Sequence, residues 1–357
     1  MLIVDAHEDI AYNALKYNRN YLTSALNIRA VESNSKTVQE TGIACLGKQE
    51  WLSGKIGIIF ATLFVPPFSH CDGNQEHMYY KNSDEAHYLA VQQLNYYHDL
   101  DQTDCFKIIF NQNDMQTVIN SWHNKNIQSI IGLILSMEGA DPVRTIDELE
   151  YWYDHGLRLI GPAWSGTRYC GGTGDPKGLT KPGENLLETM SDLNYILDVS
   201  HMSELSLEQS IDMYDGVVIA SHSNPRYAAK LDTPERLLSN VQIHNIAQTN
   251  GVIGIVPYNK FLKTHWDKSD NRNNVTIQRV AEMIDYICQL TGSCNHVGIG
   301  SDFDGGFGAE SIPLPMNTIA DLKMIGEEIA TLGYNVKEIN QIMSQNWINV
   351  LNRVLPS

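Results

Sequence analysis

Residues 2–9 read Leu2-Ile3-Val4-Asp5-Ala6-His7-Glu8-Asp9, and this stretch carries the two signals from which we predict the fold. Its apolar residues predict a short buried strand, and His7 and Asp9 follow two positions apart. Residues i and i+2 of an extended chain project from the same face, whereas the residue between them points into the opposite layer. An imidazole and a carboxylate at the end of a strand are half of a metal site, although His-X-Asp also occurs by coincidence.

Seven further apolar runs of strand length follow, and helical patterns alternate with the later ones. The runs lie at residues 56–60, 130–135, 157–160, 195–199, 217–220, 252–256 and 297–300. The helical patterns lie at residues 145–155, 184–194, 203–213, 234–249 and 276–290. Continuous runs rich in Val and Ile are typical of strands that are covered on both faces. Repeated β–α units imply parallel strands, and eight of them favour a (β/α)₈ TIM-type barrel over an open sheet.

The remaining segments are expected to extend this barrel. Residues 163–182, rich in Gly and Pro, and the polar residues 259–275 predict two long inserted loops. The apolar run at 106–110 has no place among the eight strands and is assigned to an insertion. From residue 319 onward we expect a C-terminal helical tail outside the barrel. Because no repeat or linker divides the chain, residues 1–357 are expected to form a single domain.

Composition limits the classes of partner. The net charge of -17 argues against nucleic acid and against an anionic membrane surface as the main partner. The six cysteines show no CxxC or zinc-finger spacing, which predicts free, mostly buried thiols in a reducing compartment. No secretory leader and no apolar run of membrane-spanning length is recognisable, so we expect a cytoplasmic location and no membrane.

Ligand-type side chains follow five of the eight predicted strands. They are His7 and Asp9 after the first strand, then Glu138, His201, His222 and Asp302 after later ones. Barrel enzymes build their sites from the C-terminal ends of several strands, so these residues should meet at one mouth. Imidazoles and carboxylates without thiolates suit Zn²⁺, and also Mn²⁺, Fe²⁺ or Co²⁺. Five ligands are more than one catalytic zinc usually takes, which favours two metals bridged by Glu138.

Each of these residues has an ordinary alternative. His201 or His222 alone would more often be a hydrogen-bonded core histidine, and Glu138 a turn carboxylate or helix cap. Asp302 and Asp304 precede two glycines and could be turn formers. The coincidence of five strand ends favours the metal site. The remaining histidines, among them His70, His77, His87 and His98, are interpreted as surface residues.

Five motifs in this order resemble the membrane (renal) dipeptidase family, a branch of the metal-dependent amidohydrolase superfamily. The motifs are Asp-Ala-His7-Glu-Asp9, Ser-Met-Glu138-Gly, Asp198-Val-Ser-His201, Ser-His222-Ser-Asn and Gly-Ser-Asp302-Phe-Asp-Gly. The resemblance implies a zinc-dependent dipeptidase that cleaves dipeptides with a free C-terminus by means of a metal-bridging hydroxide. It implies two Zn²⁺ ions per chain: His7 and Asp9 hold the first, His201 and His222 hold the second, and Glu138 bridges them. It also implies a homodimer.

The same resemblance suggests roles for other residues. Asp302 would take the proton of the attacking water and deliver it to the leaving amine. Arg236, or Lys230 nearer in register, would bind the substrate carboxylate, and Tyr258 would contact the substrate. Trp164 stands where mammalian members have a histidine that stabilises the oxyanion, so the metals or a neighbour such as Arg168 would take over that role. This departure leaves open an amidohydrolase of the same barrel type that acts on another amide, ester or lactone. A barrel that binds metal or ligand without catalysis is a third, less favoured alternative.

Overall fold

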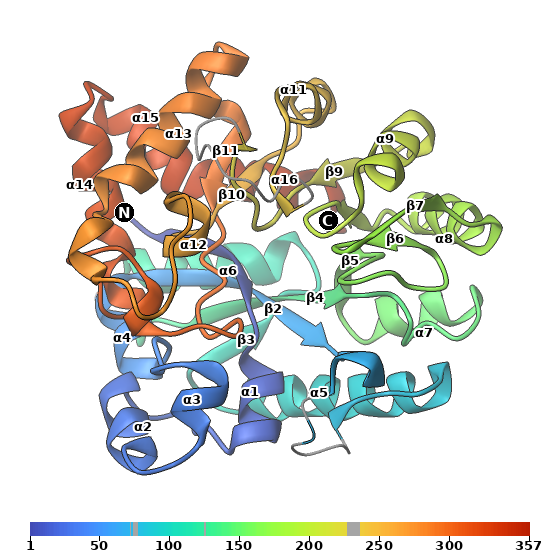
Figure 1. Ribbon diagram of the computed structural model, residues 1–357, viewed down its shortest axis with the longest axis horizontal. Helices are drawn as coiled ribbons and strands as arrows, with labels where there is room; N and C mark the ends of the chain where they lie inside the picture. Colours follow the sequence, from blue (N-terminus) through green and yellow to red (C-terminus); the bar gives the residue numbers. More distant parts are fainter. Residues whose placement is uncertain (72, 74–77, 125, 227–235) are drawn as a thin grey trace.

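The structure is a computed structural model that describes residues 1–71, 73, 78–124, 126–226 and 236–357. Parallel strands form its centre (Figure 1). In spatial order they run β10–β11–β1–β2–β4–β5–β8–β9. Their bounds are β1 (Ile3–Glu8), β2 (Ile56–Phe64), β4 (Ile131–Glu138), β5 (Leu157–Gly161), β8 (Ile196–Asp198), β9 (Val217–Ile219), β10 (Ile253–Ile255) and β11 (Val297–Ile299).

The two ends of this strand path meet at Ala220, the residue after β9. Ala220 pairs in parallel with Ile253 of β10. Its N–H donates to the carbonyl of Val252 at 3.0 Å, and its carbonyl accepts from the N–H of Gly254 at 2.8 Å. These bonds close the path into a barrel, which confirms the predicted (β/α)₈ architecture.

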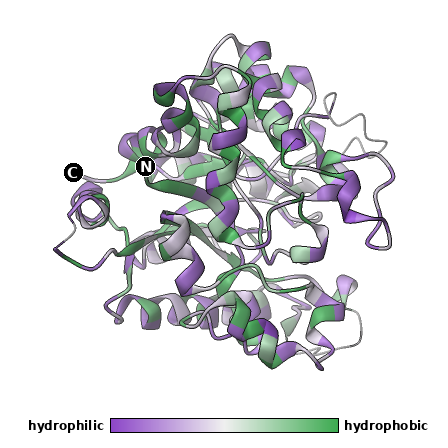
Figure 2. Cartoon of the chain, turned by 90° about the vertical axis from the view of Figure 1, so that its left-hand side faces the viewer, coloured by the Kyte–Doolittle hydropathy of each residue, from purple (hydrophilic) through white to green (hydrophobic). Residues whose placement is uncertain are grey.

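Helices surround the strands and extend past them at the C-terminus (Figure 1). Their bounds are α1 (Ile10–Tyr17), α2 (Ala25–Glu32), α3 (Thr37–Thr41), α4 (Lys48–Gly54), α5 (Ser83–Asp101), α6 (Gln112–His123), α7 (Glu148–Asp154), α8 (Lys181–Asp192), α9 (Glu204–Met213), α11 (Asn240–Gln248), α12 (Asn259–Leu262), α13 (Gln278–Thr291), α14 (Lys323–Thr331), α15 (Val336–Asn340) and α16 (Asn346–Val354). The predicted C-terminal helices are therefore present. Figure 2 shows the apolar residues gathered along the central strands and the polar residues on the outer helix faces.

The buried apolar residues form one cluster mainly between strands and helices, and a second one that includes residues of the barrel interior and of α16. Trp347 of α16 belongs to the second cluster, and its ring centroid lies 5.4 Å from that of Phe60 on β2. Its indole N–H donates to the carbonyl of Ile299 at 3.0 Å. A Cβ added at Gly298 would lie 2.3 Å from the indole nitrogen, so only glycine permits this fit. The predicted tail thus packs against the barrel core.

Several expected boundaries need correction. The run at 106–110 contributes β3 (Phe106–Ile108), which pairs in parallel with β4 instead of lying in a separate insertion. The expected loop 163–182 contains an antiparallel hairpin of β6 (Cys170–Gly172) and β7 (Asp175–Leu179). A Cβ at Gly171 would lie 2.0 Å from the carbonyl oxygen of Lys177, so glycine permits the close approach of the two strands.

Two helix starts also differ from expectation. Helix α11 begins at Asn240 rather than near residue 234, because Ser239 forms a capping box with Gln242. Residues 234 and 235 lie outside the described part of the chain. Helix α7 begins at Glu148, and Thr145 does not cap it. Gly156 follows this helix with φ +101°, as expected of a residue that ends a helix.

Two further expectations concern cysteines and membranes. All six cysteines lie within the described residues and are free thiols, four of them buried. Within the described ranges, no helix has both the length and the apolar character needed to cross a membrane.

Candidate metal centre and active site

The structure brings the six predicted site residues together at the C-terminal mouth of the barrel. His7 is on β1 and Glu138 is the last residue of β4, whereas the others lie on the turns after β1, β8, β9 and β11, namely Asp9, His201, His222 and Asp302. Parallel strands of a barrel end on the same side, which is why residues so distant in sequence meet here. The roles of five of them as metal ligands, and of Asp302 as the proton-transfer group, stay predictions.

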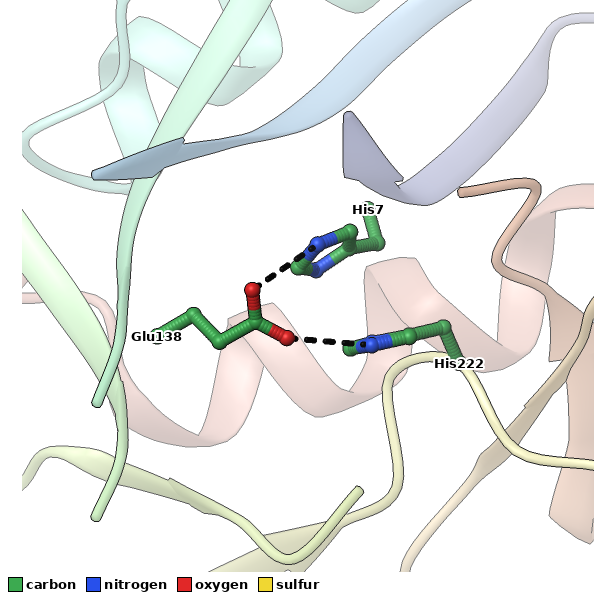
Figure 3. A group of neighbouring side chains, drawn as sticks. All are labelled: His7, Glu138 and His222. Carbon is green, nitrogen blue, oxygen red and sulfur yellow. Dashed lines mark ion pairs between the residues drawn. The ribbon is translucent and has the colours of Figure 1, made fainter. Parts of the chain in front are cut away.

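The carboxylate of Glu138 lies between imidazoles from different strands. Its Oε1 is 3.0 Å from Nε2 of His201 and 3.2 Å from Nε2 of His222, and its Oε2 is 3.9 Å from Nε2 of His7. Figure 3 shows one oxygen facing His7 and the other facing His222. The Nε2 atoms of His201 and His222 are themselves 3.0 Å apart. One carboxylate oxygen thus faces the imidazole of His7 and the other faces the imidazoles of His201 and His222. This is the orientation of a carboxylate that bridges two metal ions.

His7 faces carboxylates on its other side as well. Its Nε2 lies 3.9 Å from Oδ1 of Asp9 and 3.9 Å from Oδ1 of Asp302. Within the described residues, buried Nε2 of His7 and Oδ1 of Asp9 make no hydrogen bond. Glu8 points the other way, as expected, and accepts a hydrogen bond from the indole N–H of Trp51 at 3.0 Å. Unpartnered buried polar atoms are costly unless a ligand satisfies them.

A hydroxyl group stands beside Nδ1 of each imidazole. Nδ1 of His7 lies 3.3 Å from Oγ1 of Thr62, and Nδ1 of His201 lies 3.0 Å from Oγ1 of Thr173. Nδ1 of His222 lies 2.7 Å from Oγ of Ser221. A hydroxyl that accepts the Nδ1 proton leaves Nε2 free as a metal ligand, the arrangement typical of metal-binding histidines.

The hydroxyl groups are the site residues that our sequence analysis missed. Ser221 directly precedes His222, so its position was a usable signal. Thr62 on β2 and Thr173 in the hairpin turn carry no local signal. Buried Asp198 supports the same region: it accepts hydrogen bonds from the Ser200 hydroxyl at 2.6 Å and from the Ser221 N–H at 2.9 Å, and another from the Ser221 hydroxyl.

Burial controls the electrostatics of the carboxylates. It raises the pKa of Asp9, Glu138 and Asp302 well above the usual range. Their mutual proximity adds to the shift, since Glu138 raises the pKa of Asp9 and Asp302 raises that of Glu138. Three carboxylates at this spacing therefore need positive charge nearby if all of them are to be ionised.

Burial acts in the opposite sense on the imidazoles. It lowers the pKa of His7 to about 3, and Arg236 contributes in the same direction. It also lowers the pKa of His201 and of His222 well below the usual range, again with a contribution from Arg236. The imidazoles are therefore neutral at physiological pH, and neutral imidazole is the form that binds metal.

A cavity of about 300 Å³ opens over this cluster. Arg236, Tyr258 and Trp164 line it together with Asp302, so the three predicted substrate-binding residues share one space. Arg236 is anchored there, because it donates to the carbonyls of Ser200 at 3.0 Å and His222 at 2.8 Å. Tyr258 stacks on the ring of Phe307, with 4.1 Å between centroids.

The sequence offered Lys230 as an alternative to Arg236, and Arg168 as a group that could support an oxyanion. Lys230, the competitor of Arg236, lies outside the described residues. Arg168 forms an ion pair with Asp141 at 3.7 Å and also donates to the carbonyl of Val143. It is not among the residues that line the cavity, so the suggestion that it supports an oxyanion is not favoured.

The expectation that the other histidines lie on the surface was partly wrong. His87 and His98 are partly buried. Nδ1 of His87 contacts the carbonyl of Pro142, and Nε2 of His98 contacts the carbonyl of His155. His70 is exposed as expected, yet it lines the cavity and its ring centroid lies 4.8 Å from that of Trp164. His77 lies outside the described residues.

The closed barrel and its carboxylate-imidazole mouth define a barrel protein with a candidate metal centre, and comparison with known proteins identifies its family. Residues 1–355 match the family described as membrane dipeptidase (peptidase family M19). The chain belongs to this family, and it is therefore a hydrolase of a metallodipeptidase family.

The chain is also similar to individual proteins, and solved structures share its fold. Dipeptidase ataJ of Aspergillus terreus is 25% identical over 381 residues, which cover 99% of this chain and 84% of that protein. An uncharacterized protein in the pqqA 5' region of Klebsiella pneumoniae is 30% identical over 235 residues, 63% of this chain and 83% of that protein. A crystal structure of a metallopeptidase from Rhodobacter sphaeroides, liganded with a phosphinate mimic of the dipeptide L-Ala-D-Ala, superimposes with a TM-score of 0.78 at 21% identity and covers 99% of both chains. The structure of the dipeptidase AC, a metallopeptidase of family M19, gives a TM-score of 0.79 at 21% identity and covers 100% of this chain and 99% of that one.

Proposed function

We propose that the chain is a dipeptidase with two Zn²⁺ ions, which hydrolyses the peptide bond of dipeptides that have a free C-terminus. The orientation of Glu138 supports this proposal most directly, because its two oxygens face imidazoles on opposite sides. His7 and Asp9 would hold the first ion, and His201 and His222 the second. Family membership supports the same activity.

The donor set fits a bound cation on three counts, and the first of them includes zinc. Its members are nitrogen and oxygen donors that zinc accepts. Nε2 of His7 and Oδ1 of Asp9 make no hydrogen bond within the described residues, and a cation would satisfy both. The raised pKa of Glu138 reflects burial and the nearby Asp302 charge, and a cation would reverse that effect.

The reaction would divide between the ions and the protein. Zinc would supply an activated water and polarise the scissile carbonyl. Asp302 would take a proton from the attacking water and pass it to the leaving amine, since it lies 3.9 Å from Nε2 of His7 and faces the cavity. The Arg236 guanidinium, held by two backbone carbonyls, would place a positive charge for the substrate carboxylate. Tyr258, which lines the same cavity, would contact the substrate.

Trp164 supports a second candidate, hydrolysis of another amide, ester or lactone by the same centre. Its indole lines the cavity and has its ring centroid 6.4 Å from that of His201. An indole N–H donates one hydrogen bond and carries no positive charge. An oxyanion would therefore receive less support here than from a protonated histidine, which favours substrates with a better leaving group.

Metal analysis combined with a substrate panel tests both candidates. We expect about two zinc ions per chain, loss of dipeptide cleavage after chelation, and recovery when Zn²⁺ is added. His222→Ala should lower the metal content, whereas His244→Ala, which changes an exposed histidine of α11, should retain it. Dipeptide cleavage that survives complete metal removal contradicts the proposal. Metal-dependent cleavage of N-acyl amino acids or lactones, with none of dipeptides, favours the second candidate.

Three further expectations stay predictions: one domain over residues 1–357, a homodimer and a cytoplasmic location. The negative charge of the chain still argues against nucleic acid as a partner.

A further inference from the structure

Four aromatic side chains form a continuous surface at one side of the cavity, which we call the aromatic wall. They are Tyr12 of α1, Phe64 at the end of β2, His70 and Trp164. Neighbouring ring centroids are 5.0 Å apart for Tyr12 and Phe64, 5.1 Å for Phe64 and Trp164, and 4.8 Å for Trp164 and His70. Each pair meets edge to face, the packing that aromatic rings prefer.

The centre of the aromatic wall, at the end of β2, lies across the mouth from Arg236. Phe64 is the last residue of β2, whereas Arg236 and Tyr258 follow β9 and β10. In the closed strand order, β2 is separated from β9 by three strands on one side and from β10 by two on the other. Trp164 follows β5, which only β8 separates from β9, so it forms the end of the wall beside the candidate metal centre. The candidate metal centre lies between, because Trp164 approaches His201 and Arg236 contacts the carbonyl of His222.

Hydrogen bonds to the backbone of Phe64 and of Trp164 hold two members of the aromatic wall in place. Gln93 of α5 is buried, accepts from the N–H of Phe64 at 2.9 Å and donates to its carbonyl at 2.6 Å. The carbonyl of Trp164 accepts from the N–H of Thr173 at 3.1 Å, which ties the wall to the hairpin beside His201. A surface held this way loses little conformational entropy when a ligand binds.

We infer that the aromatic wall binds a large apolar or aromatic side chain on the amino-terminal residue of a dipeptide. The inference rests on the proposed function, because the orientation of the substrate follows from its carboxylate lying at Arg236. A dipeptide anchored there with its peptide bond over the metal centre directs its amino-terminal residue toward the aromatic wall. The edges and faces of Phe64 and Trp164 offer that side chain stacking and exclusion from water.

The test compares two substrates that differ only in their first residue, Phe-Ala and Gly-Ala, with the zinc-loaded enzyme. We expect kcat/KM to be at least about tenfold higher for Phe-Ala. A single methylene in a hydrophobic subsite already changes kcat/KM by about tenfold or more, and Phe and Gly differ by a whole benzyl group, so tenfold is a lower bound. Trp164→Ala should reduce the ratio of the two kcat/KM values by about tenfold or more. This ratio does not depend on the concentration of active enzyme, so partial misfolding of a variant leaves it unchanged.

A second variant and a second substrate pair serve as controls. Phe64→Leu keeps an apolar side chain at the end of β2 but removes the ring, and it should lower the same ratio. Phe261→Leu changes an aromatic residue on the Arg236 side, where the guanidinium lies 5.3 Å from its ring centroid, and should leave the ratio unaltered. Gly-Phe compared with Gly-Ala reports on the carboxyl-terminal residue, and Trp164→Ala should not change that ratio.

The outcomes separate this inference from the proposed function. If dipeptides are cleaved but Trp164→Ala and Phe64→Leu leave the Phe-Ala preference intact, the inference alone is wrong. If Trp164→Ala changes the Gly-Phe ratio instead, the aromatic wall holds the carboxyl-terminal residue and the inference is overturned. If the zinc-loaded enzyme cleaves no dipeptide, the proposed function fails and the inference falls with it.

Discussion

Replacing Arg19 with methionine should remove the cation of a buried ion cluster beside the Asp302 turn. Arg19 lies on the segment after α1 and is 3% exposed. Its Nε and Nη2 donate to the two carboxylate oxygens of Glu32 at 2.9 and 3.0 Å. Its Nη1 lies 3.0 Å from Oδ2 of Asp304, which is 1% exposed. Arg19→Met keeps a long apolar stem but leaves two buried carboxylates without their shared cation.

Asp304 connects this cluster to the candidate site. Its carboxylate accepts from the Tyr21 hydroxyl at 2.9 Å and from the N–H of Cys45 at 2.7 Å. Its carbonyl accepts from the side-chain amide of Asn13, which also donates to the carbonyl of Asp9. The backbone of Asp302 and Asp304 has φ of +56° and +63°, a conformation unfavourable for residues other than glycine. The ion cluster therefore holds a strained turn in place.

The expected loss of stability can be converted into a melting temperature. Removing one partner from a buried ion pair costs about 3–5 kcal/mol. At about 2.1 cal/mol/K per residue, the 357 residues have an unfolding entropy of roughly 0.75 kcal/mol/K, so the melting temperature should fall by about 4–7 °C.

Scanning calorimetry of the zinc-loaded protein at one scan rate measures this shift. The matched control is Lys181→Met, because Lys181 and Glu184 form an ion pair at 2.8 Å whose side chains are 78% and 42% exposed. An exposed pair contributes about 0–1 kcal/mol, so the control should melt within about 1 °C of the unaltered protein. If Arg19→Met shifts the melting temperature no further than the control does, the buried cluster does not stabilise the fold as we reason.

Three other variants or treatments follow from the structure. Asp302→Asn should retain the bound zinc but slow turnover by roughly 10²–10⁴-fold, since it removes a positioned proton-transfer group. Metal analysis and initial rates measure the two effects, and a normal rate refutes the role of Asp302 in proton transfer. Ser221→Ala removes the hydroxyl 2.7 Å from Nδ1 of His222 and should weaken zinc affinity by about 10–100-fold in a competition titration with a chelator; unchanged affinity would show that the hydroxyl does not orient the ligand. Burial raises the pKa of the Cys170 and Cys288 thiols to about 12, so at pH 8 the thiolate fraction is roughly 10⁻⁴. Mass spectrometry should find both unmodified by iodoacetamide in the native protein and alkylated after unfolding, and rapid alkylation of the native protein would contradict this.

The sequence was sufficient for the eight strands of the closed barrel and for the side chains that follow them, but not for β3 or for the hairpin of β6 and β7. Apolar runs such as 130–135 record burial on both faces, and burial is visible in the local order of residues. His7 and Asp9 could be placed at a strand end for the same reason. Because parallel strands of a barrel end on one side, chain order alone predicted that Glu138 and His222 would come near them.

Only the tertiary structure decided which residues from distant segments pack against these strands and contact the site side chains. Trp347 packs against Phe60 across a gap of nearly three hundred residues, and Thr62 meets His7 from the neighbouring strand. The pairing of Arg19 with Asp304 depends on the same kind of long-range approach. None of these pairs leaves a periodic or local pattern, because each depends on how separate segments pack.

The opening stretch shows the division most clearly. Residues 2–9 predicted a strand that ends in an imidazole and a carboxylate. The distances from Nε2 of His7 to Glu138 and Asp302, both 3.9 Å, arise from the closure of the barrel. Local sequence determines which side chains a strand presents, because the alternation of faces is a property of the backbone itself. Which other strands those side chains meet is determined by packing and pairing over the whole chain.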